Sequence, residues 1–244
     1  MKSPCNAKQL LLSNLISGLV NYERSMTGFY MSDLQTIKDR IVGTMLPEIA
    51  TSGWSWPAVT EAAAAAGFQD TMPRAVFPEG LNDVVAHFSD MIDRAMLKNL
   101  ETIDPETLRV RERVETALLQ RFKVLEGEYM AKAAKAALAY WAVPVRVMQG
   151  QRVLWRSSDR IWNWAGDQAQ DYNRYTKRGL LSSILMGTTL VWLDDKSEDH
   201  EVTKLFLKRR IENVMEIGKA IGTIRPVMPD IAKSFARTPW TSRK

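Results

Sequence analysis

The feature of this sequence that most restricts its fold is the helical spacing of apolar residues, which recurs along almost the whole chain. The strict alternation of apolar and polar residues that is typical of strands is scarce, and turn residues such as Gly53, Gly67 and Gly80 separate the helical stretches. Apolar residues three and four positions apart line one face of a helix, which then packs against other helices. The sequence therefore predicts an all-α fold.

Turn residues and capping signals bound the predicted helices. Asp104 followed by Pro105 is typical of a helix start, and Ser197 followed by two acidic residues is a good start for the last helix. The predicted helices cover residues 34–52, 56–66, 71–77, 81–100, 104–125, 128–141, 145–155, 157–169, 175–193 and 198–221.

Composition excludes several classes of function. The chain has 244 residues, and 45% are apolar and 25% charged, which suits one globular domain with at most a small N-terminal lobe. The single cysteine, Cys5, excludes an intrachain disulfide, and His87 and His200 lack the spacing of zinc or di-iron motifs. No Gly-rich phosphate loop or nucleophile elbow is present in the sequence. We therefore expect a binding protein, not an enzyme, with no metal or catalytic cofactor.

The net charge of +5 favours acidic partners, of which nucleic acid and anionic membrane surfaces are the usual ones. The most apolar run, residues 179–193, is shorter than the roughly twenty residues that cross a bilayer. We therefore expect contact with a membrane surface, if any, and not a spanning helix.

Residues 37–93 have the layout of a three-helix unit followed by a long helix, with an alanine-rich second helix and Phe77 before the long one. This resembles the DNA-binding lobe of TetR-type regulators, whose short third helix enters the major groove. Here that helix has one cation, Arg74, and the acidic residues Asp70 and Glu79 would face phosphate. The resemblance predicts a helix-turn-helix-like lobe without nucleic-acid binding. A TetR-type regulator with an apolar effector is the alternative function.

The segment from Asp159 to Arg178 interleaves aromatic residues with Asp, Asn, Lys and Arg. Aromatic residues that carry one polar group, together with Arg, dominate the energetics of protein–protein interfaces. The same residues can be core anchors, and spacing alone leaves open whether Trp162, Trp164 and Tyr172 belong to a core or to an interface.

The sequence of this segment resembles that of the COQ-nine family, whose members are TetR-like helical proteins of ubiquinone biosynthesis. Their signature runs Trp-x-x-Ala-Gly-Asp-x-x-x-Asp-x-Asn-x-Tyr-Thr-Lys/Arg-Arg. Its fixed positions are met here by Trp162, Ala165, Gly166, Asp167, Asp171, Asn173, Tyr175, Thr176, Lys177 and Arg178. The similarity extends over roughly residues 41–222, and includes the turn Ser52-Gly53-Trp54.

The resemblance implies a non-catalytic accessory protein that binds isoprenoid quinone or phospholipid at a membrane and presents the lipid to the demethoxyubiquinone hydroxylase. It also implies a homodimer, peripheral on the inner membrane and facing the bacterial cytoplasm or the mitochondrial matrix. The implied docking residues are Asp159, Ile161, Trp162, Asp171, Asn173, Arg174, Tyr175 and Arg178. Arg174 stands where some relatives carry tryptophan.

The predicted helix 175–193 is apolar on almost all sides, as expected of a central buried helix. Its small residues, such as Ser182 and Gly187, leave room for an isoprenoid chain, although a well-packed core has the same pattern. The residues assigned to lipid binding are Leu181, Ile184, Leu185, Thr188, Val191 and Trp192.

The C-terminal segment places apolar residues at helical spacing beside several cations, which is typical of an interfacial helix on an anionic membrane. The residues assigned to membrane contact are Ile224, Met228, Ile231, Phe235 and Trp240. A tail that packs on the core or pairs in a dimer is the alternative. The predicted organisation is an N-terminal extension, disordered or transit-like, at 1–32, the helix-turn-helix-like lobe at 33–100, the lipid-binding bundle at 101–222 and the amphipathic segment at 223–244.

Overall fold

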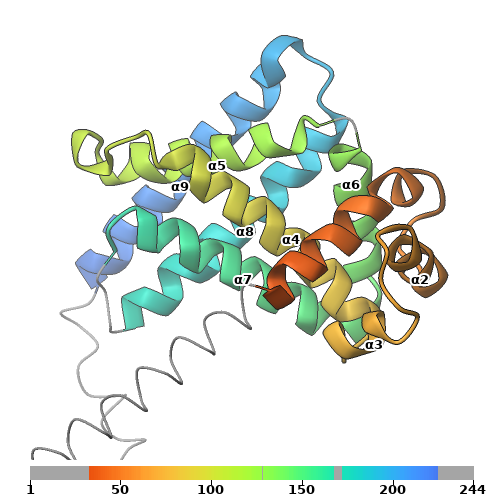
Figure 1. Cartoon of the computed structure of the whole chain (residues 1–244). Coiled ribbons are helices and arrows are strands. Elements are labelled where there is room, and N and C mark those ends of the chain that lie inside the picture. Colours follow the sequence, from red (N-terminus) through yellow and green to blue (C-terminus); the bar gives the residue numbers. More distant parts are fainter. Residues whose placement is uncertain (1–32, 128, 168–171, 225–244) are drawn as a thin grey trace, which may run out of the picture. The chain divides into compact units, whose positions relative to one another are not determined.

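The computed structural model describes residues 33–127, 129–167 and 172–224, and every regular element within these ranges is a helix (Figure 1). The predicted all-α fold is confirmed. A first helix covers residues 33–52, and it is followed by α2 (Trp56–Ala65), α3 (Met72–Val76), α4 (Leu81–Leu100), η1 (Pro105–Thr107), α5 (Val110–Leu125), α6 (Met130–Trp141), η2 (Pro144–Arg146), α7 (Val147–Trp164), α8 (Tyr172–Asp194), η3 (Glu198–His200) and α9 (Glu201–Ile224).

These helices belong to two compact units. Unit 1 holds the chain up to Met91 together with Gly127–Gln149, and unit 2 holds Ile92–Glu126 together with the chain from Gly150 onward. Helices α4 and α7 each begin in unit 1 and end in unit 2. The limits predicted for the N-terminal lobe and the lipid-binding bundle stay predictions.

Unit 1 packs around the first helix, whose residues Ile41 and Val42 are fully buried. Helix α2 begins where the hydroxyl of Ser55 accepts a hydrogen bond from the backbone N–H of Ala58 at 3.4 Å, the contact expected of an N-cap. The indole N–H of Trp54 donates to the carbonyl oxygen of Ala133 at 3.3 Å, so the turn before α2 is tied to α6.

The short helix α3 of unit 1 is the element that would read DNA in a TetR-type regulator. Its one cation, Arg74, lies over the ring of Trp56, with 4.0 Å between the guanidinium carbon and the ring centroid. A guanidinium stacked on an aromatic ring in this way is stabilised by the ring's negative face. Arg74 therefore has a partner within unit 1.

Unit 2 is built around α8, which carries fully buried Leu185 and nearly buried Leu181. Helix α9 packs along α8, and the ring of Phe206 comes within 3.7 Å of the position that a Cβ at Gly187 would occupy. A small residue at this position lets the two helices approach closely. The prediction that the helix 175–193 is buried on almost all sides is corrected, because one face, with Leu181 and Leu185, is buried, whereas Ser183 and Leu190 are exposed.

A buried carboxylate joins three helices of unit 2. Asp93 of α4 is 0% exposed, and one of its oxygens accepts a hydrogen bond from Arg121 of α5 at 3.0 Å. Its other oxygen accepts from the hydroxyl of Ser157 at 2.7 Å and lies 3.5 Å from Arg160, both on α7. A buried charge is tolerated only when it is paired and hydrogen-bonded, and Asp93 meets both conditions.

One helix, α7, stands where two were predicted at 145–155 and 157–169, and the prediction of a break between them is wrong. Helix α7 ends at Trp164, before the predicted end at 169. Ser157 and Ser158, where the second of the two helices was predicted to begin, lie inside α7. Their hydroxyls have partners on neighbouring helices, because Ser157 donates to Asp93 and Ser158 lies 2.9 Å from the hydroxyl of Ser182. Serine with an interhelical partner can remain inside a helix.

Three other helix starts differ from the prediction by three residues or more. Asp104 does cap a turn, since it accepts from the N–H of Glu106 at 2.9 Å, but that turn is η1 and α5 begins only at Val110. The last helix begins at Glu201, after a turn in which Asp199 and His200 have positive φ. Helix α8 begins at Tyr172, three residues before its predicted start.

Candidate functional site

The candidate site lies where α7 ends and α8 begins, and its geometry starts from Gly166. The backbone N–H of Gly166 donates to Asn163 and that of Asp167 donates to Trp162, the paired bonds of a Schellman motif. Gly166 has a φ of 82°, in the left-handed region that favours glycine. A Cβ there would also lie 3.1 Å from Nη1 of Arg113. The glycine of the segment therefore ends α7 and turns Asp167 back toward α8.

A cluster of charged side chains, centred on Arg178, joins α7 to α8. Nε of Arg178 contacts Oδ1 of Asp159, and Nη1 donates to Oδ2 of Asp167 at 3.1 Å. Nη2 donates to the side-chain oxygen of Asn163 at 3.3 Å, and Lys177 donates to the second oxygen of Asp167 at 2.5 Å. Arg178 is 1% exposed, so its guanidinium is almost completely enclosed by these partners. We call this set, Asp159, Asn163, Asp167, Lys177 and Arg178, the Arg178 cluster.

Both carboxyls of the Arg178 cluster stay ionised at neutral pH. Burial alone raises the pKa of Asp159, but hydrogen bonds and positive charge from Arg178, with help from Asn163 and Arg174, hold that pKa below its usual range. Burial likewise raises the pKa of Asp167, and hydrogen bonds from Lys177 and Arg178 outweigh it and lower the pKa. Hydrogen bonding to the charged form of a carboxyl favours that form.

Trp162 links the two helices through its polar atom. Its indole N–H donates to the carbonyl oxygen of Lys177 at 3.1 Å, and the ammonium group of Lys177 lies 5.3 Å from the ring centroid. Trp162 and Lys177 of the signature therefore contact each other through a hydrogen bond and through the charge of Lys177 near the indole ring. Trp162 is half-buried.

The outer face of the site is aromatic. Tyr175 of α8 is 62% exposed, and its ring lies 6.0 Å from the ring of Trp155, which is 36% exposed on α7. Arg174 is also exposed and places Nη2 at 3.4 Å from Asp159. Trp155 was absent from the predicted docking residues. Its spacing of four and seven positions from Asp159 and Trp162 puts it on their helix face and could have identified it. We call Trp155, Arg174 and Tyr175 the aromatic patch.

The structure separates the predicted docking residues into three groups. Asp159, Trp162, Arg174 and Tyr175 come together on one side of α7 and α8. Ile161 is 0% exposed and Arg178 is 1% exposed, so neither presents surface to a partner, and the prediction of direct contact is corrected for both. Ile161 packs into the core, and the charge of Arg178 is used within the chain. Asn173 belongs to α8, and Asp171 lies outside the described residues.

Five of the six residues predicted to bind lipid are buried inside unit 2. Leu181, Ile184, Leu185, Thr188 and Trp192 are each at most 6% exposed and lie on the inner face of α8. Their positions follow the helical repeat, so the segment presents one continuous face to the interior. Val191 is half-buried and differs from the other five.

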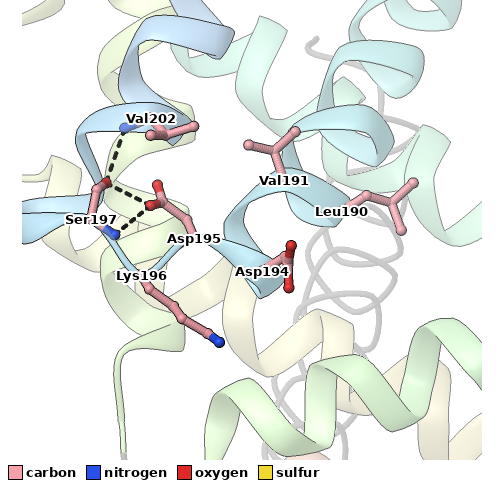
Figure 2. A pocket seen from close by; sticks show the side chains of 7 residues that line it. All are labelled: Leu190, Val191, Asp194, Asp195, Lys196, Ser197 and Val202. Carbon is pink, nitrogen blue, oxygen red and sulfur yellow. Dashed lines mark hydrogen bonds between the residues drawn. The ribbon is translucent and has the colours of Figure 1, made fainter.

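A pocket of about 460 Å³ lies at the turn between α8 and α9. Figure 2 shows Val191 on its wall, together with Leu190 and Val202. The polar side of the pocket is formed by the turn itself, where Asp195 accepts hydrogen bonds from the N–H and hydroxyl of Ser197. The remaining lining residues are Asp194 and Lys196.

The residues predicted to contact a membrane are at the edge of the structure or beyond it. Ile224 is the last residue of α9, and Met228, Ile231, Phe235 and Trp240 lie outside the described residues. In the described part of the chain, none of the helices is both long and apolar enough to cross a membrane. Among the same residues, His, Cys, Asp and Glu side chains do not gather in a group that could hold a metal ion.

Comparisons with known proteins agree with the fold and the signature. The family model described as COQ9 matches residues 147–218, which include α7, α8 and most of the described part of α9. A solved structure of a TetR transcriptional regulator from Nitrosomonas europaea superposes with a TM-score of 0.56 over 72% of this chain and 97% of its own. Its sequence is 21% identical, so this likeness concerns the fold alone.

Two relatives are 30% identical to this chain. One is the mitochondrial ubiquinone biosynthesis protein COQ9 of Xenopus tropicalis, aligned over 79% of this chain and 62% of its own length. The other is the mitochondrial protein COQ9-B of Xenopus laevis, aligned over 79% of this chain and 67% of its own length. The chain thus spans about three fifths to two thirds of these relatives. Taken together with the complete signature at the end of α7, these matches show that the chain belongs to the COQ9 family.

Proposed function

We propose that this protein is a non-catalytic accessory protein of ubiquinone biosynthesis. In this role it binds an isoprenoid quinone-like lipid at a membrane and presents the lipid to the demethoxyubiquinone hydroxylase. The names of the relatives support the pathway. The inner face of α8 is largely apolar, which is the kind of side chain that an isoprenoid chain would contact.

The observation that supports the docking part of the proposal is that the exposed aromatic patch lies beside the Arg178 cluster, which ties α7 to α8. The Arg178 cluster fixes the ends of α7 and α8, and Trp155 and Tyr175 project from these helices with their rings 6.0 Å apart. Interfaces are commonly anchored by Trp, Tyr and Arg residues, and anchors that are held in place before binding lose less entropy on docking. The aromatic patch supplies all three residue types.

Replacement of Tyr175 by alanine tests this proposal. We expect Tyr175→Ala to weaken binding to the demethoxyubiquinone hydroxylase by about tenfold or more, because truncation of an interface anchor costs upwards of about 1.4 kcal/mol. The thermal midpoint should change little, since the side chain is 62% exposed. Affinity is measured by calorimetry or by surface-based binding with the purified hydroxylase.

Val110→Ala is the matched control, because Val110 is also half-exposed and apolar but begins α5, outside the patch. Tyr175→Phe separates the ring from the hydroxyl and should retain most of the affinity. If Tyr175→Ala and Val110→Ala bind the hydroxylase as tightly as the unmodified protein, the aromatic patch is not the docking site.

A further inference from the structure

Two polar atoms of α8 have no hydrogen-bond partner among the described residues. The hydroxyl of Thr188 belongs to a side chain that is 0% exposed, and the indole N–H of Trp192 belongs to one that is 5% exposed. Buried polar groups are nearly always hydrogen-bonded, and a buried donor without a partner costs stability. These two atoms therefore require an explanation that the fold does not supply.

The two residues lie together on the inner face of α8. They are four positions apart, which places them one above the other on the same side of a helix. The same face continues through Leu181 and Leu185, both buried and apolar. The ring of Phe122 stacks on Trp192 with 6.0 Å between centroids. The polar atoms thus lie at one end of a stripe of apolar side chains.

The turn after α8 closes this end of the stripe. The ring of His200 lies 5.4 Å from that of Trp192, and its Nδ1 is a further buried atom without a hydrogen-bond partner. Both Asp199 and His200 have positive φ, of 52° and 54°, a conformation that residues with a Cβ rarely adopt. Such a conformation persists only where the surrounding structure imposes it, and it concentrates at functional positions.

The negative charge of Asp195, near the His200 end of the stripe, restricts which chemical group could bind there. Nδ1 of His200 lies 4.0 Å from Oδ2 of Asp195, and hydrogen bonds from Ser197 and Thr203 hold the pKa of Asp195 far below its usual range. Asp195 is therefore ionised, and an anionic group beside it would be repelled. A neutral oxygen is the group that can accept from an indole N–H without this repulsion.

We propose that the inner face of α8 carries a polar binding site, formed by the hydroxyl of Thr188 and the indole N–H of Trp192, for a neutral carbonyl or hydroxyl oxygen of an otherwise apolar ligand. The site rests on the proposed lipid binding and deepens it, because it assigns the polar end of the ligand to the end of α8 near His200. The apolar stripe through Leu185 and Leu181 then holds the rest of the molecule.

Thr188→Val tests the site, because valine has the shape of threonine and lacks its hydroxyl. The probes are decylubiquinone, which carries quinone carbonyls, and decylbenzene, which has the same alkyl chain and no oxygen. Calorimetry should show that Thr188→Val weakens binding of decylubiquinone by about five- to tenfold, the effect of one lost hydrogen bond. Binding of decylbenzene should be unchanged. The thermal midpoint of the ligand-free variant should rise, since an unpartnered polar group is replaced by a methyl.

Thr189→Val is the matched control. Thr189 is the adjacent residue and is also buried, but its hydroxyl already donates to the carbonyl oxygen of Leu185 at 2.7 Å. This variant should leave the affinity for both probes unchanged. As a second measurement, the indole N–H resonance of Trp192, identified with Trp192→Phe, should move downfield with decylubiquinone and stay in place with decylbenzene.

The outcomes separate this inference from the proposed function. If the unmodified protein binds neither probe, both the lipid-binding proposal and the polar site are wrong. If it binds both probes and Thr188→Val binds decylubiquinone as tightly as the unmodified protein, lipid binding stands and the polar site is overturned. A lower thermal midpoint in Thr188→Val, with no change in affinity, would assign the hydroxyl to a buried water.

Discussion

A guanidinium that is 1% exposed needs carboxylate partners, because an unpaired charge in a protein interior costs several kcal/mol. Arg178 has two such partners, Asp159 and Asp167, and they lie at the end of α7 and just beyond it. The family signature includes Asp167 and Arg178, and their geometry gives a physical reason for this pairing. The two residues fix the turn on which the aromatic patch depends.

Arg178→Leu should therefore be strongly destabilising. It leaves Asp167, whose side chain is 4% exposed, with Lys177 as its one remaining cationic partner in the cluster. Removal of one partner from a buried ion pair typically costs about 3–5 kcal/mol of unfolding free energy. Urea denaturation followed by circular dichroism measures the change.

Arg174→Leu is the control for this substitution, because Arg174 contacts Asp159 from an exposed position at 3.4 Å. An exposed pair of this kind contributes about 0–1 kcal/mol. Equal losses of stability in the two variants would show that the buried position of Arg178 has no special importance.

At the scale of helices, some starts and ends follow from local sequence signals. Others depend on contacts between helices, which the sequence does not show. Glycine after a run of helical spacing predicts a helix end, and Gly166 does end α7 in this way. A helix was also predicted to begin at Ser157. It does not, because Ser157 and Ser158 lie inside α7, where Asp93 and Ser182, distant in sequence, supply their hydrogen-bond partners. Contacts between helices cannot be read from local spacing.

Gly166→Ala should destabilise unit 2, although alanine is ordinarily the better helix residue. A Cβ at a φ of 82° costs about 1–2 kcal/mol, and contact with Arg113 at 3.1 Å adds to that cost. Gly179→Ala is the matched substitution, since Gly179 lies inside α8 with open space where a Cβ would be placed. It should stabilise the protein by up to about 1 kcal/mol.

Thermal unfolding of the two variants checks the sign of each effect. Opposite shifts of the midpoint are expected, downward for Gly166→Ala and upward for Gly179→Ala. A neutral Gly166→Ala variant would contradict the structural reason given for this glycine.

At the scale of the whole molecule, the all-α class followed directly from the apolar spacing, and the fold and family followed from the resemblance. The sequence did not predict which residues of the signature segment are buried. Spacing alone left open whether Trp162 belongs to the core or to an interface, and in the structure it is half-buried, with its indole N–H bonded to the backbone of Lys177. Trp155 precedes the segment from Asp159 to Arg178 and was not among the predicted docking residues, although it shares a helix face with Asp159. The burial of Trp162 and the position of Trp155 in the patch depend on residues that are close in space but distant in sequence.

The proposed function depends on the presence of a lipid inside the protein, and native mass spectrometry of the purified full chain tests this most directly. The unpartnered donors at the far end of α8 are the feature that a bound lipid would explain. We predict a co-purified isoprenoid quinone or phospholipid, seen as an added mass that organic extraction releases. A protein that carries no such mass, and takes up none from vesicles containing ubiquinone, would contradict the proposed function.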